Sequence, residues 1–161
     1  MKKPNAYEIV LLLILAAIAA FLLQRDIAGA QQAPKPQVFA EFRSKLALDG
    51  YDPVAYFKTG QPQKGNPTHA LSWNGATWHF ASAENKSAFE AGPAAFAPQF
   101  GGYCAWAVSQ GYTAKGDPSA WRIVDGKLYL NYNASVQKTW ERDIPSNIAK
   151  GERNWPTVLS K

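Results

Sequence analysis

The sequence predicts a small single α+β domain in which two β-hairpins pack against several short helices. Two turns carry this prediction, because Asn74-Gly75 and Asp125-Gly126 each stand between two runs rich in aromatic and aliphatic residues. Asn-Gly and Asp-Gly suit the two-residue type I′ turn, which needs a positive φ at both positions. Helix-forming segments separate and follow the hairpins. This order of elements is typical of an α+β fold.

The first 30 residues have the order of an export signal, and we expect residues 1–30 to be a signal peptide or an N-terminal membrane anchor. A basic start precedes an apolar run from Ile9 to Leu23, and small residues follow at 28–30. A helix over that run would be about 22 Å long, short of the roughly 30 Å hydrocarbon core, which favours cleavage after Ala30. We therefore expect an exported, periplasmic protein. The inner membrane is a partner only if the segment is uncleaved, with the domain then anchored on the periplasmic side.

The rest of the chain has the length of one domain. We expect a tether at 31–44, a folded domain at 45–156 and a C-terminal tail at 157–161, and no internal repeat is evident. The net charge of +5 comes from scattered residues and not from a run of lysine and arginine. Nucleic acid is therefore not an expected partner.

In the first part of the domain, residues 47–57 are expected to form a turn and then a short strand. The first hairpin follows, and Ser82 is positioned to cap a helix that runs to about Ala91 and buries Phe89. The cross-strand pairs predicted for this hairpin are Trp73 with Ala76, Leu71 with Trp78, and His69 with Phe80.

In the second part, a short helical segment is expected over 94–100, and a glycine turn then leads into another short helix ending near Val108. Asn133 can cap a helix that continues to Glu141, and a last helical stretch ends by Trp155. The pairs predicted for the second hairpin are Ile123 with Leu128, and Trp121 with Leu130.

Four stretches resemble the exported bacterial YHS-domain proteins. They are DGYDPVAYF at 49–57, WHFAS at 78–82, GGYCA at 101–105 and DGKLYLNY at 125–132. The resemblance covers nearly all of residues 45–156 and implies a YHS-like fold. Classical YHS domains are small metal-associated modules, found for example attached to copper-transporting ATPases. Ala81 and Asn85 stand where the metal-associated versions carry cysteines, so that thiolate site is absent here.

Cys104, the only cysteine, is the candidate redox thiol and metal ligand. In the exported branch some relatives carry selenocysteine at the matching position, which implies redox activity or binding of a soft metal. Gly101-Gly102 before a helix start would bring N–H groups close to the sulfur and lower its pKa. The alternative is a buried, inert cysteine packed among its aromatic neighbours.

His79 is the candidate second metal ligand or proton-transfer partner, because it lies on the polar face of the first hairpin. Tyr103, Tyr51 and Asp52 are the candidate binding residues, and Asp49 belongs to the same polar cluster. Turn formation is the alternative role of Asp52, which precedes a proline.

The sequence thus predicts a thiol-dependent role, either redox chemistry or binding of a copper-type soft metal through Cys104. The cofactor would be copper or another soft metal, and the partner a metal ion or a redox partner protein. The alternative is a non-catalytic small-molecule or protein-binding module in which Cys104 is a packed core residue. The sequence does not decide whether the chain is an enzyme.

Overall fold

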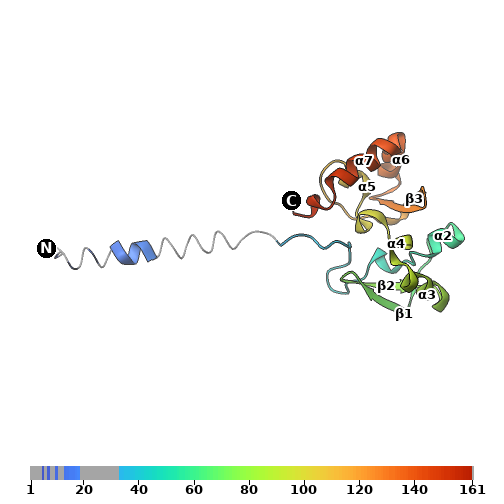
Figure 1. Cartoon of the computed structure of the whole chain (residues 1–161), viewed down its shortest axis with the longest axis horizontal. Helices are drawn as coiled ribbons and strands as arrows, with labels where there is room; N and C mark the ends of the chain where they lie inside the picture. Colours follow the sequence, from blue (N-terminus) through green and yellow to red (C-terminus); the bar gives the residue numbers. More distant parts are fainter. Residues whose placement is uncertain (1–4, 6, 8–9, 11–12, 19–32, 161) are drawn as a thin grey trace. The chain divides into compact units, whose positions relative to one another are not determined.

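The computed structural model describes residues 5, 7, 10, 13–18 and 33–160 (Figure 1). The chain divides into two units, Met1–Ala33 and Pro34–Lys161. In the first unit residues 13–18 are helical and exposed. Within the described ranges, no helix has both the length and the apolarity needed to span a bilayer. The predicted cleavage site at 28–30 lies outside the described residues.

The second unit contains two antiparallel two-stranded sheets and several short helices, which confirms the predicted α+β fold class. Its α-helices are α2 (Ala55–Thr59), α3 (Ala83–Ala91), α4 (Pro93–Phe96), α5 (Ala105–Ser109), α6 (Ala134–Trp140) and α7 (Ile144–Asn154). Its strands are β1 (Asn66–Trp73), β2 (Ala76–Phe80), β3 (Asp117–Val124) and β4 (Lys127–Asn131). The 3₁₀ segments are η1 (Leu48–Gly50), η2 (Gln99–Gly102), η3 (Glu141–Asp143) and η4 (Thr157–Ser160).

The unit is built from two halves with the same order of elements, a repeat that the sequence analysis did not find. One half is η1-α2-β1-β2-α3 and the other is η2-α5-β3-β4-α6. Figure 1 shows α3 beside β1 and β2, and in the second half α6 packs against β3 and β4. Three consecutive residues have positive φ at 48–50, and again at 100–102. A bridge joins Tyr51 to Lys64 in the first half, and the equivalent bridge joins Tyr103 to Lys115 in the second.

Both hairpins have the predicted register beside their turns. Leu71 pairs with Trp78 in the first hairpin, and Ile123 pairs with Leu128 in the second. The predicted pair of His69 with Phe80 is wrong, because Phe80 pairs with Asn66 across an irregularity in β1. The irregular stretch contains Pro67, and proline has no N–H to give to the ladder. β3 has the same irregularity around Pro118.

The two predicted helix caps are present, whereas the strand predicted before the first hairpin is not. The backbone N–H of Asn85 donates to Ser82 Oγ at the start of α3, and the N–H of Val136 donates to Asn133 Oδ1 at the start of α6. The strand predicted within residues 47–57 is absent. That stretch forms η1 and the start of α2, because the Asp52 carboxylate accepts the backbone N–H groups that open the helix.

The helical segment predicted over 94–100 is broken into two pieces. α4 ends at Phe96 and η2 begins at Gln99. Pro98 lies between them in an extended conformation, and a proline also disfavours the helical conformation of the residue before it. The short helix predicted after the glycine turn is present as α5, and the last helical stretch is α7.

Two hydrophobic clusters form the core, and β4 supplies both of them. Leu128 and Leu130 belong to the cluster that contains Trp78 and Phe89, whereas Tyr129 belongs to the cluster around Trp140. Side chains alternate across a strand, so β4 presents one face to each cluster. All its residues after Lys127 are buried.

Both ends of the second unit pack against it, so the compact unit is wider than the expected domain of 45–156. On the N-terminal side, Val38 is buried and the Phe39 N–H donates to the Gly101 carbonyl. On the C-terminal side, Val158 and Leu159 of η4 are buried in the second cluster. Val38 and Phe39 of the expected tether, and Val158 and Leu159 of the expected tail, therefore belong to the folded unit.

Trp78→Ala tests the first cluster. Trp78 is fully buried and its ring lies 5.2 Å from that of Phe89. Truncating a fully buried tryptophan should lower the free energy of unfolding by about 3–5 kcal/mol, measured by chemical denaturation. Phe42→Ala is the control, since Phe42 is 83% exposed, and it should change the value by less than about 0.5 kcal/mol. Equal effects of the two variants would contradict the packing.

Candidate functional site

Cys104 lies at the start of α5, directly after the glycine turn, as the sequence predicts. Its side chain is 1% exposed. The sulfur accepts the backbone N–H of Tyr132 at 3.2 Å and that of Ala107 at 3.5 Å. The thiol in turn faces Asn131 Oδ1 at 3.9 Å. The sulfur thus holds together the start of α5 and the end of β4.

The expected low pKa of Cys104 is wrong in sign. Burial raises the pKa of the Cys104 thiol, and the N–H groups of Ala107, Tyr132 and Trp106 lower it by less. The N–H groups predicted from the glycine turn are therefore present, but loss of water disfavours the thiolate more strongly than they favour it.

Asp52 occupies in the first half the place that Cys104 occupies in the second. Each residue follows a run of three positive-φ residues by two positions and stands shortly before a short helix. The Asp52 carboxylate accepts the N–H groups of Val54 and Ala55 at the start of α2. It also accepts the N–H of Ala81 after β2, as Cys104 accepts that of Tyr132 after β4. Asp52 is fully buried and is therefore a structural acceptor and not part of an open binding surface.

The predicted partner His79 is not a hydrogen-bond partner of the Cys104 sulfur. His79 lies beside η1, and a Cβ on Gly50 would come 3.6 Å from its Nδ1. The hydrogen bonds of the Cys104 sulfur involve residues 107, 131 and 132, and none involves His79. Among the described residues, no group of three or more His, Cys, Asp or Glu side chains is arranged to hold a metal ion.

The two candidate tyrosines have structural contacts. Tyr103 is buried, and its hydroxyl donates to the Pro36 carbonyl at 2.9 Å. Burial also raises its pKa. The Lys64 ammonium lies 4.2 Å from the centre of the Tyr51 ring and donates to the Asp49 carbonyl at 2.6 Å. Tyr51 and Lys64 thus fix the backbone of η1, on which Asp49 stands.

An open pocket of about 340 Å³ lies where the two halves meet. Its lining residues are Asp49 from η1, and Lys115, Asp117 and Tyr132 from the second half. The Lys115 ammonium pairs with the Asp49 carboxylate at 2.6 Å. Tyr132 lines the pocket, and its backbone N–H donates to the Cys104 sulfur. Tyr132 therefore connects the pocket to the buried thiol. Asp49 belongs to the polar cluster predicted from the sequence, whereas Lys115, Asp117 and Tyr132 are not among the predicted site residues. The recurrence of Lys-Gly-Asn-Pro at 64–67 as Lys-Gly-Asp-Pro at 115–118 was the available signal.

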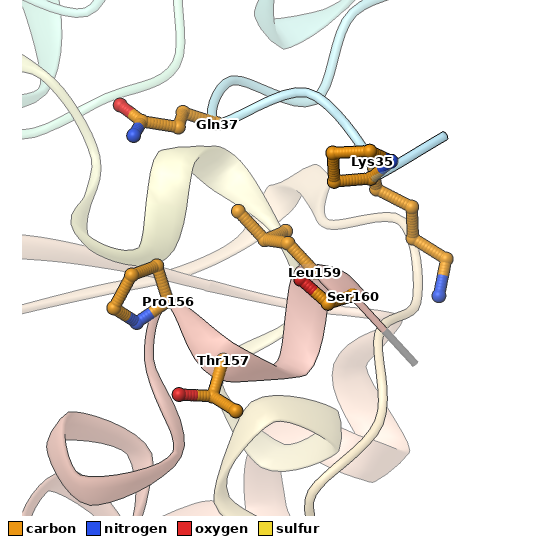
Figure 2. Close-up of a pocket in the computed structure, with 7 residues that line it drawn as sticks. Lys35, Gln37, Pro156, Thr157, Leu159 and Ser160 are labelled. Carbon is orange, nitrogen blue, oxygen red and sulfur yellow. The ribbon is translucent and has the colours of Figure 1, made fainter. Parts of the chain in front are cut away.

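A second pocket, of about 380 Å³, lies between residues 34–37 and η4 (Figure 2). Pro156 and Leu159 supply apolar surface to it. In Figure 2 the polar ends of the Gln37 and Lys35 side chains point away from one another. Ligand sites combine a concave surface with polar groups that converge. Of these two pockets in the described part of the chain, the Asp49 pocket is the one lined by charged groups close enough to pair.

Comparisons with family models, with curated proteins and with solved structures found no match for this chain. The resemblance to the exported YHS-domain proteins therefore stays a prediction from the sequence.

The raised pKa of Cys104 predicts a pH dependence of stability. Above about pH 8.5 the unfolded chain loses the thiol proton, whereas the folded protein retains it. The folded state then binds more protons than the unfolded state, so the free energy of unfolding should fall as pH rises. Cys104→Ser removes this contribution. Denaturation curves between about pH 8 and pH 9.5 should show a steeper fall for the wild type than for the variant. If the free energies of unfolding of the two proteins fall in parallel with pH, burial does not raise the pKa of the Cys104 thiol.

The acceptor role of the sulfur predicts an order of stabilities among variants. Cys104→Ala leaves the N–H groups of Ala107 and Tyr132 without their acceptor and should cost about 1–3 kcal/mol in urea denaturation. Cys104→Ser keeps an acceptor and should cost less. Asp52→Ala should cost more than either, because it removes a charged acceptor of four hydrogen bonds. A Cys104→Ala variant as stable as the wild type would refute the acceptor role.

Proposed function

We propose that this protein is a non-catalytic small-molecule-binding module, exported from the cytoplasm, in which Cys104 is a packed structural residue. The observation that carries the proposal is the environment of the sulfur, which is 1% exposed and serves as an internal hydrogen-bond acceptor. A reactive or metal-binding thiol is commonly in a partly exposed and electropositive surrounding, whereas a buried cysteine is inert. The equivalence with Asp52 adds support, since both halves need an acceptor at this position whatever its chemistry.

The thiol-dependent role, redox chemistry or copper(I) binding, is the competing proposal. The same N–H groups that the sulfur accepts would stabilise a thiolate once the site opened. This role therefore requires an opening that separates α5 from the residue after β4. Such an opening breaks the contacts of Cys104 with Ala107 and Tyr132.

Alkylation kinetics separate the two proposals. The full-length protein is treated with iodoacetamide at a series of pH values, and modification of Cys104 is followed by mass spectrometry, with denatured protein as the reference. The binding module predicts that the folded protein reacts at least about tenfold more slowly than the denatured protein at every pH, because reaction waits for local opening.

A parallel titration with copper(I) completes the test, with Cys104→Ser as the matched variant. The binding module predicts the same copper(I) affinity for both proteins. Fast alkylation of the folded protein with a midpoint below about pH 8.5, or copper(I) binding that Cys104→Ser abolishes, would overturn the proposal in favour of the thiol-dependent role.

A further inference from the structure

We infer that the pocket lined by Asp49, Lys115, Asp117 and Tyr132 binds a small organic cation. The inference rests on the proposed function, and it assigns both the site and the class of ligand. Its basis is the unpaired carboxylate in the pocket, the exposed aromatic residue that lines the same pocket, and a comparison of the same positions in the two halves.

The pocket is lined by one ion pair and by one further carboxylate, that of Asp117. Asp49 and Lys115 neutralise each other at 2.6 Å. Asp117 forms no ion pair within the described part of the chain, and its Oδ1 accepts the backbone N–H of Ser119 at 2.8 Å. Lys64, the other nearby cation, is held by the Asp49 carbonyl and the Tyr51 ring and does not line the pocket. The pocket is thus locally acidic on a chain whose net charge is +5.

Tyr132 lines the same pocket as Asp117 and brings an aromatic residue to it. Tyr132 is 56% exposed although its backbone is fixed by the hydrogen bond to Cys104. A carboxylate and an aromatic face together attract organic cations, the first through charge and the second through the ring quadrupole. A small anion, in contrast, would have to displace Asp49 from Lys115 and would then face Asp117.

The first half shows that the fold does not require these side chains. The position equivalent to Asp117 is Asn66, whose Oδ1 accepts the Thr68 N–H in the same turn. An amide is therefore sufficient for the turn, and the charge of Asp117 has no role in it. The position equivalent to Tyr132 is Ala81, and both residues use only the backbone N–H to reach the acceptor of their half.

The fold does not require the Asp49 side chain either, as its equivalent in the second half shows. It has φ of 49°, in the left-handed region, and its equivalent Gly101 has φ of 60°. Glycine adopts this region without the steric cost that other residues meet there. Asp49 thus stands at a position where the second half has glycine, and its carboxylate pairs with Lys115.

The test measures binding of n-butylammonium to the full-length protein by NMR, following the backbone amides of Asp117 and Tyr132. Sodium butyrate and inorganic phosphate at matched ionic strength serve as anion probes. Saturable shifts with n-butylammonium alone are expected. Asp117→Asn should weaken binding about tenfold or more without a change in melting temperature, because Asn66 fills the same turn in the first half. Asp125→Asn, which removes a carboxylate at the opposite end of the β3–β4 hairpin, is the charge-matched control and should leave binding unchanged.

Two further variants separate charge from the ring. Tyr132→Phe should bind n-butylammonium as the wild type does, whereas Tyr132→Ala should bind a few-fold more weakly. No saturable shift, an equal response to butyrate or phosphate, or full binding by Asp117→Asn would overturn the inference. Cys104 alkylation in the same samples distinguishes the two failures. Slow alkylation with no cation binding overturns only this assignment, and fast alkylation overturns the proposed function.

Discussion

The burial of β4 on both faces is the constraint on which the rest of the domain depends. Leu128 and Leu130 point into one hydrophobic cluster and Tyr129 into the other, so a single five-residue strand joins the two cores. A shift of its register by one residue would exchange these side chains between the clusters. The Asp125-Gly126 turn sets the register, and the Cys104 sulfur fixes the backbone just beyond the strand's end. The exposed hairpin turn and the buried acceptor thus hold opposite ends of the same strand.

The repeat explains why a buried cysteine lies where a reactive one was expected. In each half a short helix begins next to the end of a hairpin, and the N–H groups of both need one common acceptor. A buried N–H group without a hydrogen-bond partner destabilises the folded state. The position therefore requires a hydrogen-bond acceptor, and either an oxygen or a sulfur atom can fill that role. A carboxylate meets the need in the first half, where Asn85 also donates to it. A thiol meets it in the second half.

The repeat also separates what the fold requires from what it tolerates. Gly65 and Gly116 occupy equivalent places, and a Cβ at either would overlap the backbone of a neighbouring segment. These two glycines are steric requirements of the frame. Asp49, Asp117 and Tyr132 have equivalents that are uncharged and not aromatic, namely Gly101, Asn66 and Ala81. The pocket therefore lies at a place where the two halves have the same backbone arrangement and different side-chain chemistry.

The sequence by itself determined the local elements, because their causes are local. The turn dipeptides set the register of both hairpins beside the turns, and Ser82 and Asn133 cap α3 and α6 where the capping pattern predicts. Residues 47–57 were misassigned because the helix start there depends on Asp52, whose carboxylate also reaches Ala81 across the fold. Only the tertiary structure decided whether the Cys104 side chain is buried or exposed, since this depends on which segments cover the sulfur. It also decided the pocket, because Asp49 meets Lys115 through packing of the two halves. Local sequence patterns do not determine that packing, because it depends on contacts between segments that are distant in the chain.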